Sequence, residues 1–347
     1  MQQQRKAVVL LSGGLDSMLA AKLMLEQGIH VEAINFFTGF CVEGHTHAIR
    51  SRAQDKPKRN NALWSAKQLG IKLHIIDIVE EYKNIVINPK HGYGTNLNPC
   101  LDCKIFMVKK AHEWMKDNGF DFIVTGEVMG QRPMSQTKFK IPIISAQSGA
   151  NDLVVRPLCG KNLPATLPER EGWIDRDKLL AITGRSRARQ FALAAQYGFE
   201  DYAQPAGGCC FLTDKYYANK LQDLWQARGD KTYSLDDIML LKVGRHIRPK
   251  PHYKIIIGRD QGENNYLRGY QHQFIKLFVS SHPSPVALIE GDIEADDLEF
   301  AACIVARYSQ GRDCDTVIVQ VSKPDGSQDE LTIAPLPAAH IAKEWML

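Results

Sequence analysis

The stretch that most limits what this chain can fold into lies close to its first residue and reads VVLLSGGLDSML. Residues 7–11 form an apolar, β-branched run of the kind found in buried parallel strands, and residues 15–27 carry apolar side chains at helical spacing. Gly28 follows as a residue suited to end that helix. Residues 12–17 are therefore predicted to form a turn that leads from a strand into a helix.

This turn has the composition of a loop that holds an anion. Gly13 and Gly14 let the backbone approach an oxyanion closely, and the free N–H groups of the helix start point at it. The hydroxyls of Ser12 and Ser17 add donors. Asp16 would repel a bare phosphate, so we expect it to act beside Mg²⁺. The turn lacks the Lys of a GxxxxGK[ST] loop, which argues against transfer of a γ-phosphoryl group.

The string SGGLDS resembles the SGGxDS signature of the PP-loop ATP pyrophosphatases. The resemblance implies that ATP is split to AMP and pyrophosphate, that a substrate oxygen is adenylylated, and that residues 12–14, 16 and 17 bind the nucleotide. It also implies a backbone contact to adenosine at Gly126, in the later segment TGEVMGQ, where a plain turn glycine is the alternative. The activated oxygen then needs a nucleophile to displace it.

Strands and helices alternate in the first part of the chain. Candidate strands are residues 7–11, 31–37, 73–78, 120–125 and 153–156, and candidate helices are 15–27, 60–69 and 104–118. Such alternation predicts an α/β fold with a doubly wound parallel sheet, and with the loop motif it resembles the adenine nucleotide alpha hydrolase-like fold. Ligands bind beyond the carboxyl ends of parallel strands, so the loops that follow the strands should converge there.

The chain divides into three parts by its patterns. Residues 1–165 are expected to form the ATP-binding domain, 166–232 a helical extension with a second cysteine motif, and 233–347 a smaller α+β domain. The length of 347 residues and 44% hydrophobic content suit two or three domains. No run of 18 apolar residues and no secretion signal is visible, so no membrane partner and a cytoplasmic location are expected.

Eight cysteines are too few for a disulfide scaffold in a chain of this length. Cys100 and Cys103 form a CxxC at the start of a predicted helix, where thiolates are stabilised and two at this spacing can share a metal or redox centre. Cys209 and Cys210 follow two glycines in QPAGGCCFLT. Buried, inert thiols are the ordinary interpretation of the remaining cysteines: Cys41, Cys159, Cys303 and Cys314.

NPCLDCK resembles the NPxxxCN segment of tRNA-specific 2-thiouridylases of the MnmA type, and GGCCFLT resembles their GxCFI segment. The resemblance places Cys103 and Cys210 at the two family cysteines that carry or relay sulfur. Cys100 stands where many members have Asp. With Cys100 added, the set resembles tRNA thiolation enzymes that hold a [4Fe-4S] cluster on three cysteines and leave one iron open.

Two alternatives remain for the sulfur chemistry. Cys209 is a candidate to replace Cys210 as third ligand, to close the cluster as a fourth ligand, or to have no part in it. In a second mechanism without metal, Cys210 carries a persulfide and Cys103 resolves it as a disulfide. This mechanism leaves Cys100 without a role and therefore ranks below the cluster.

Basic residues lie in three further segments. Residues 44–61 are expected to form a surface loop, with an RNA-contacting lid as the minority alternative, and His45 and His47 there are read as loop residues. Residues 184–198 predict a helix whose start carries Arg185 and Arg187. These two arginines either are solvated or contact an RNA backbone near the cysteines.

The third basic segment, LKVGRHIRPKPHYKIIIGR, contains six cations and no acid, with histidines and a tyrosine interleaved. This pattern suits contacts to a phosphate backbone together with stacking, and a solvated basic face is the alternative. LLKVGRHIR and KIIIGRDQGENN resemble the NFACT-R RNA-binding domain. The predicted RNA-binding residues of this segment are Lys242, Arg245, Arg248, Lys254 and Arg259.

Together these patterns predict an enzyme that uses ATP and Mg²⁺ to adenylylate a uracil oxygen in tRNA and then delivers sulfur, with Asp16, Cys103 and Cys210 as catalytic residues. The product 2-thiouridine is favoured over 4-thiouridine. The predicted partners are tRNA and a sulfur donor, either sulfide or a carrier protein, and a homodimer is one option for the assembly. The alternatives are an ATP-dependent amide ligase or amidotransferase and a non-catalytic RNA-binding factor.

Overall fold

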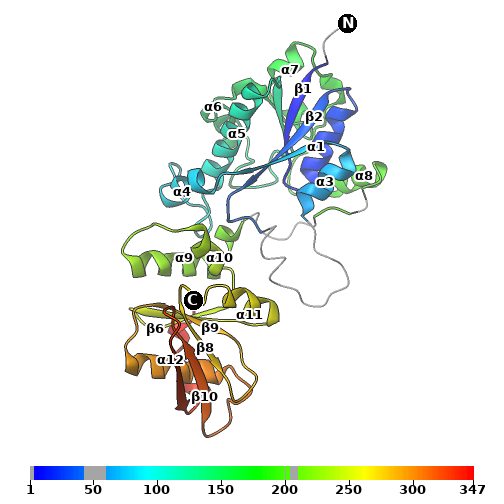
Figure 1. Cartoon of the computed structure of the whole chain (residues 1–347). Helices are drawn as coiled ribbons and strands as arrows, with labels where there is room; N and C mark the ends of the chain where they lie inside the picture. The colour runs from blue at the N-terminus through cyan, green and yellow to red at the C-terminus, as the bar shows by residue number, and fades with distance from the viewer. Residues whose placement is uncertain (1–3, 43–59, 200, 204–209) are drawn as a thin grey trace. The chain divides into compact units, whose positions relative to one another are not determined.

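The computed structural model describes residues 4–42, 60–199, 201–203 and 210–347. These residues form two compact units, the first ending at Thr213 and the second starting at Asp214 (Figure 1). Of the sequence predictions, those for Cys209, His45 and His47 lie outside the described residues. The predicted helical part, 166–232, is divided between the units, because its first helices belong to the first unit and α9 (Lys215–Arg228) to the second.

The first unit is built on a parallel sheet covered by helices on both faces. Its strands have the order β3-β2-β1-β4-β5, and every described pair in it is parallel. The strands are β1 (Lys6–Leu10), β2 (His30–Phe37), β3 (Leu73–Asp77), β4 (Phe122–Thr125) and β5 (Val154–Val155). The helices are α1 (Leu15–Leu25), α3 (Asn61–Leu69), α4 (Val79–Ile87), α5 (Cys100–Asp117), α6 (Lys140–Gln147), α7 (Leu167–Arg170) and α8 (Ala188–Gln196).

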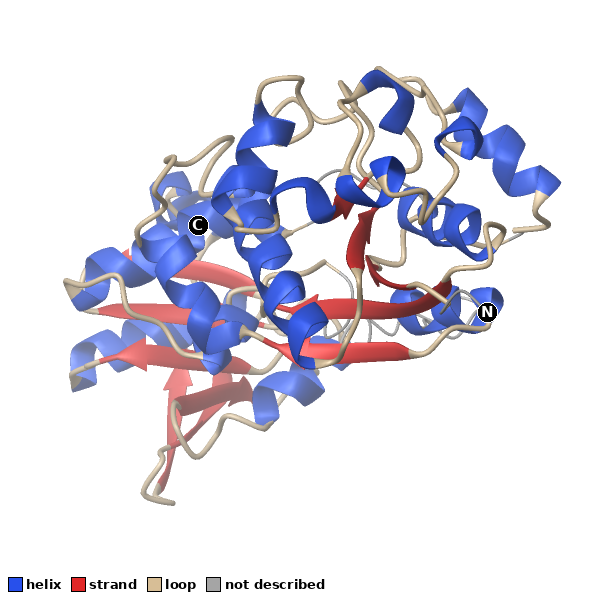
Figure 2. Cartoon of the chain, turned by 90° about the horizontal axis from the view of Figure 1, so that it is seen from above, coloured by secondary structure: helices blue, strands red, loops and turns tan. Residues whose placement is uncertain are grey.

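Alternation along β1 explains the two layers of helices. Ala7 and Val9 pack into a core shared with α1 and α8, whereas Val8 packs into a second core shared with α5 and α6. Figure 2 shows helices on both sides of these strands. The predicted doubly wound α/β fold is confirmed, because a strand with apolar side chains on both faces must be covered on both.

The structure adds elements that the sequence pattern did not predict. Helices α4 and α6 were not among the helices predicted from the sequence, and α5 begins at Cys100 rather than at residue 104. The Cys103 N–H donates to the Pro99 carbonyl at 2.8 Å, which closes the first turn. Both cysteines of the CxxC therefore lie in the first turn of α5, three residues apart and on one face of the helix.

The second unit is an α+β domain with an antiparallel sheet of order β11-β10-β8-β9-β7-β6. Its strands are β6 (Arg245–Lys250), β7 (Tyr253–Ile257), β8 (Ile275–Val279), β9 (Ala287–Gly291), β10 (Val317–Ser322) and β11 (Gln328–Ile333). Its helices after α9 are α10 (Leu235–Leu240), α11 (Gln261–Arg268) and α12 (Ala295–Arg307). Ile255 packs toward α12, and Ile256 packs toward α10 and α11, so helices cover both faces.

The last residues of the chain return to the edge strand β6. Met346 forms an isolated antiparallel bridge with Ile247, and the Leu347 N–H donates to the His246 carbonyl at 3.1 Å. The tail is thereby held against the antiparallel sheet.

Candidate active site

The loop between β1 and α1 has the geometry that its glycines predicted. Gly13 has a φ of 81°, a left-handed conformation that favours glycine. The Ser17 hydroxyl donates to the Gly14 carbonyl at 2.8 Å, and the hydroxyl oxygens of Ser12 and Ser17 lie 3.5 Å apart. Gly14, at the N-cap position of α1, has no side chain to cap the helix start. The helix start is thus left open to an anion.

Two close approaches hold this loop against its neighbours. A Cβ at Gly13 would lie 2.7 Å from the Cβ of Asn61, at the start of α3. A Cβ at Gly126, directly after β4, would lie 2.5 Å from the backbone N of Ser17. The loops after β1 and β4 therefore meet as the strand order predicts, since both follow carboxyl ends at one edge of the sheet. The adenosine contact at Gly126 stays a prediction.

Asp16 is held by side chains from two later segments. Gln131 donates from Nε2 to one carboxylate oxygen at 2.6 Å, and Arg187 donates to the other at 3.3 Å. Gln190, on α8, donates to Gln131 at 3.0 Å. Arg187, a predicted RNA contact, lies at the nucleotide loop with 16% of its side chain exposed, and its contact with RNA stays a prediction. Arg185, in contrast, lies on the surface.

A buried ion pair lies in the segments that follow β4 and β5. The Nε of Arg156 lies 2.9 Å from a carboxylate oxygen of Glu127, and both side chains are buried. Burial raises the pKa of Glu127, but the Arg156 guanidinium, together with Lys104 and the Thr125 hydroxyl, outweighs it and leaves that pKa below its ordinary value. Glu127 is therefore a charged structural group of the loop that contains Gly126.

The two predicted cysteine motifs lie side by side. The Asn96 side chain donates to the Thr213 carbonyl at 2.8 Å, and the Cys210 sulfur lies 4.0 Å from the Asn98 side-chain oxygen. Cys210 also forms an isolated antiparallel bridge with Cys41, just beyond the end of β2. Cys41 thus lies at the predicted site. The sequence gave no signal of this, because Cys41 is not part of a recognisable cysteine motif.

The described residues contain no group of three His, Cys, Asp or Glu side chains placed to hold a metal ion. Cys100, Cys103 and Cys210, as placed here, therefore do not form a ready-made cluster site. Asp16 likewise has Arg187 and Gln131 at its two carboxylate oxygens instead of further ligands for Mg²⁺.

Cys159 has a structural position apart from these motifs. Its thiol donates to the Glu127 carbonyl at 3.2 Å, and burial raises its pKa to about 11. A thiol that stays protonated is a poor nucleophile, so the sequence interpretation of Cys159 as an inert buried cysteine agrees with this environment.

Most of the predicted RNA-binding cations of the second unit have internal partners. Lys254 is fully buried and lies 2.9 Å from Glu290 and 3.6 Å from Asp223. Arg248 makes paired hydrogen bonds to Asp223. The same segment therefore does not form a continuous basic surface, and an RNA contact by Lys254 is not supported by its placement.

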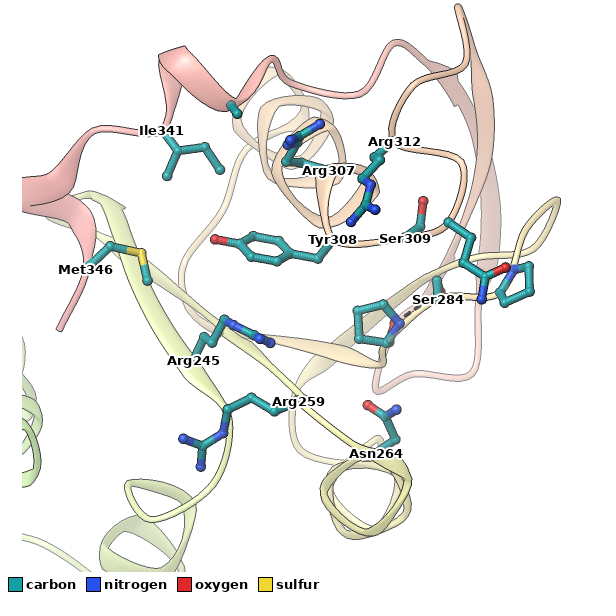
Figure 3. Close-up of a pocket in the computed structure, with 15 residues that line it drawn as sticks. Arg245, Arg259, Asn264, Ser284, Arg307, Tyr308, Ser309, Arg312, Ile341 and Met346 are labelled. Carbon is teal, nitrogen blue, oxygen red and sulfur yellow. Dashed lines mark hydrogen bonds between the residues drawn. The ribbon is translucent and has the colours of Figure 1, made fainter. Parts of the chain in front are cut away.

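Of the remaining predicted cations, Lys242 is buried, Arg245 is partly buried and Arg259 is exposed. Arg259 makes paired hydrogen bonds to the buried carboxylate of Glu263, and Lys242 is buried beside the Met239 sulfur at 3.4 Å. Arg245 and Arg259 both line a cavity, but Arg245 has no carboxylate partner among the residues that the structure describes. Figure 3 shows Arg245 near Arg307, Tyr308 and Arg312, which the sequence pattern did not single out because they lie about 60 residues further along the chain.

These features define a nucleotide-loop α/β domain followed by an antiparallel α+β domain. Residues 2–163 match the family model of the thiamine biosynthesis protein ThiI, and residues 244–346 match that of the NFACT protein RNA binding domain. The chain therefore carries a ThiI-family PP-loop domain and a C-terminal NFACT-R domain. Among the described residues, no helix is long and apolar enough to cross a membrane.

Curated relatives match part of the chain. The chain is 30% identical over 161 residues to a "Probable tRNA sulfurtransferase" of Thermococcus kodakarensis, covering 45% of this chain and 38% of that protein. It is 31% identical over 146 residues to the "tRNA-specific 2-thiouridylase MnmA" of Mesoplasma florum, covering 39% of each. The chain thus spans well under two thirds of these relatives.

One solved structure is titled as a 4-thiouridine synthetase–RNA complex with bound ATP. It shares 22% identity with this chain, covers 56% of this chain and 41% of its own, and superimposes with a TM-score of 0.37.

Proposed function

We propose that this protein uses ATP to thiolate a uridine of tRNA. The observation that carries the proposal is the contact between the two cysteine motifs. Cys210 lies against Asn98, two residues before α5, and its backbone forms an isolated antiparallel bridge with that of Cys41. Cys41 follows β2, and the nucleotide loop follows the adjacent parallel strand β1. The thiols and the nucleotide loop therefore belong to one edge of the same sheet, where α/β domains bind their ligands.

Three features of the first unit support the use of ATP. Its loop offers an open helix start and serine hydroxyls to phosphate oxygens, and the ThiI family model matches this domain. Arg187 adds a cation beside Asp16 that can stabilise charge developing on pyrophosphate. ATP would adenylylate the uracil oxygen, so that AMP becomes the leaving group. Mg²⁺ at Asp16 stays a prediction, and no step is assigned to it.

Two cysteines are sufficient for the sulfur step. A persulfide-carrying donor protein would transfer its outer sulfur to the Cys210 thiolate, which leaves a persulfide on Cys210 and a thiol on the donor. The Cys103 thiolate attacks the Cys210 sulfur, a Cys103–Cys210 disulfide forms, and sulfide leaves. That sulfide attacks the activated carbon and expels AMP, and a cellular dithiol then reduces the disulfide.

The [4Fe-4S] cluster on Cys100, Cys103 and Cys210 remains the alternative that the sequence ranked first. The segment with Cys100 and Cys103 lies beside the segment with Cys210, which supports this choice of ligands. The described His, Cys, Asp and Glu side chains, however, form no group of three that could hold a metal ion. No step is therefore assigned to a cluster. Measuring iron and acid-labile sulfide in anaerobically purified and reconstituted protein decides between the mechanisms: stoichiometric amounts support the cluster, and their absence supports the persulfide.

The thiolated position has two candidates. The resemblance of the cysteine motifs to 2-thiouridylases supports 2-thiouridine. The second candidate is 4-thiouridine, because the C-terminal domain of this chain is unlike that of the usual 2-thiouridylases. The two isomers have the same mass and differ in chromatographic retention and in ultraviolet absorption, so one separation identifies the product.

The test is nucleoside mass spectrometry of tRNA from the source organism with and without the gene. Loss of one thionucleoside, restored by the wild type and not by Cys103→Ala or Cys210→Ala, is the expected result. Cys314→Ala is the matched control, because Cys314 is an exposed cysteine of the second unit. Persistence of every thionucleoside in the deletion strain would reject the proposal, and ATP turnover with ammonia and without RNA would favour an amide ligase.

A further inference from the structure

A cavity of about 740 Å³ opens in the second unit, where six segments meet. The cavity is lined by the start of β6, the residues after β7, Asn264 of α11, the loop before β9, the end of α12 and the C-terminal tail. Figure 3 shows its polar residues, with Tyr308 between Arg245 and Arg307 and with Arg312 beside them. A volume of this size accommodates a small ligand or one or two nucleotides.

Four arginines line this cavity, and one of them, Arg259, is paired with the buried carboxylate of Glu263. The other three are not neutralised in this way. Arg245 has no carboxylate partner among the residues that the structure describes, and its guanidinium carbon lies 5.4 Å from the centre of the Tyr308 ring. Arg307 and Arg312 share one carboxylate, Asp313, at 3.6 and 3.7 Å. Asp313 is 83% exposed, so water screens that pairing strongly.

The position of Arg307 has an alternative structural explanation. It lies in the last turn of α12, where a cation favours the helix dipole. That explanation does not extend to Arg312, which lies beyond the helix, or to Arg245, which lies on another element. Three guanidinium groups around one concave surface therefore remain as a feature that helix stability does not require.

Tyr308 supplies a ring to the same cavity. The ring is half-buried and fixed against the core of the domain, with Arg245 beside it. An aromatic ring next to a guanidinium plane is the arrangement on which unpaired bases stack, while arginines bind the phosphates on either side. A paired base within a duplex cannot stack on a ring at the wall of a cavity.

We propose that the cavity formed by Arg245, Arg307, Tyr308 and Arg312 binds an unpaired nucleotide of RNA. The base stacks on Tyr308, and the arginines bind the adjoining phosphates. This inference rests on the proposed function for the identity of the RNA and deepens it, because it names the unpaired part of the RNA as the part that the second unit binds.

The test measures binding by fluorescence anisotropy with the full chain and two labelled RNAs, a blunt hairpin and the same hairpin with a four-nucleotide single-stranded 3′ extension. The wild type is expected to bind the extended hairpin at least about tenfold more tightly. Tyr308→Ala should abolish this preference. Arg245→Gln and Arg307→Gln should weaken binding of the extended hairpin and lower the slope of log affinity against log salt by about one each.

Arg268→Gln is the matched control, since Arg268 is an exposed arginine at the end of α11, outside the cavity. Tyr308→Phe keeps the aromatic ring and removes only the hydroxyl, so this variant should still bind the extended hairpin more tightly than the blunt one. Thermal unfolding identifies variants that fail to fold, and Arg312→Gln, at an exposed position, provides a cavity variant with little structural risk.

Equal binding of the two hairpins by the wild type, or equal losses in Arg268→Gln and the cavity variants, would overturn the inference. Equal binding of a glutamate-rich peptide would also overturn it, because the cavity would then be a general anion site. The proposed function is tested separately. If cavity variants bind the two hairpins equally and still thiolate tRNA, that result supports the proposed function.

Discussion

The guanidinium of Arg187 lies 3.3 Å from a carboxylate oxygen of Asp16, although the two residues are 171 positions apart in the chain. Asp16 belongs to the first turn of α1, and Arg187 immediately precedes α8. The pairing joins the nucleotide loop to the segment that the sequence assigned to RNA. Arg187 therefore lies at the nucleotide loop, whereas Arg185 lies on the surface.

Arg187→Gln should lower ATP-dependent pyrophosphate release by about a hundredfold, because it removes a cation next to the loop that receives the phosphates. Arg185→Gln is the control and should leave the rate within about twofold. The assay is pyrophosphate release with saturating tRNA, alongside RNA affinity by anisotropy. A loss of RNA affinity in Arg187→Gln with an unchanged rate of release would restore the original RNA assignment.

Gly126→Ala should destabilise the first unit by about 3 kcal/mol and abolish ATP binding. The added Cβ would lie 2.5 Å from the Ser17 backbone nitrogen, and two backbone segments would have to separate. Gly14→Ala is the comparison for stability, since its Cβ would meet nothing nearer than 3.5 Å. Urea unfolding and ATP titration measure both effects, and equal stability of the two variants would contradict the packing argument.

Arg156→Met should lower the free energy of unfolding by about 3–5 kcal/mol, because it leaves the Glu127 carboxylate buried without its partner. Glu127→Leu combined with Arg156→Met should recover most of that loss. In the wild type the lowered pKa of Glu127 means that its contribution is present at neutral pH and lost as the pH falls through the folded-state value. Urea unfolding of the three proteins between about pH 3 and pH 7, a range that covers the titration of carboxyl groups, checks this pH dependence.

The free energy of unfolding of the second unit should increase as the pH rises from about 8 to 10.5, because of the titration of Lys220. Burial, followed by the nearby charges of Arg259 and Lys254, lowers the pKa of Lys220 from 10.5 to about 8. Between these values the unfolded chain binds more protons than the folded one, so stability increases with pH.

Lys220→Met tests this directly. The variant should flatten the rise in stability and cost no more than about 1 kcal/mol at pH 7, where the buried cation is most unfavourable. Thermal unfolding across the alkaline range provides the measurement. An identical pH profile in both proteins would show that other groups are responsible for it.

Local pattern was sufficient to predict the strands of the first unit and the turn at residues 12–17. The apolar run before SGGLDS leaves few alternatives to a buried strand, and Gly13 adopts the conformation that only glycine adopts readily. The start of α5 was predicted four residues late, because Pro99 and two cysteines carry no helical periodicity.

The candidate site was predicted less completely, since its contacts join segments that are distant in the sequence. The backbone bridge between Cys41 and Cys210 and the ion pair between Arg187 and Asp16 both depend on tertiary folding. The six-cation run between Lys242 and Arg259 contains no acid, and its partners Asp223, Glu263 and Glu290 come from other elements. Charge counted along the chain therefore overestimated the charge at the surface.

The return of the C-terminal tail to β6 has a practical consequence for the production of the protein. Met346 and Ile341 line the cavity that contains Arg245, and Leu347 is hydrogen bonded to His246. A purification tag fused after Leu347 would start beside that cavity, and a polyhistidine sequence there would add protonatable groups next to the arginines. Tags for RNA-binding experiments therefore belong at the other end of the chain.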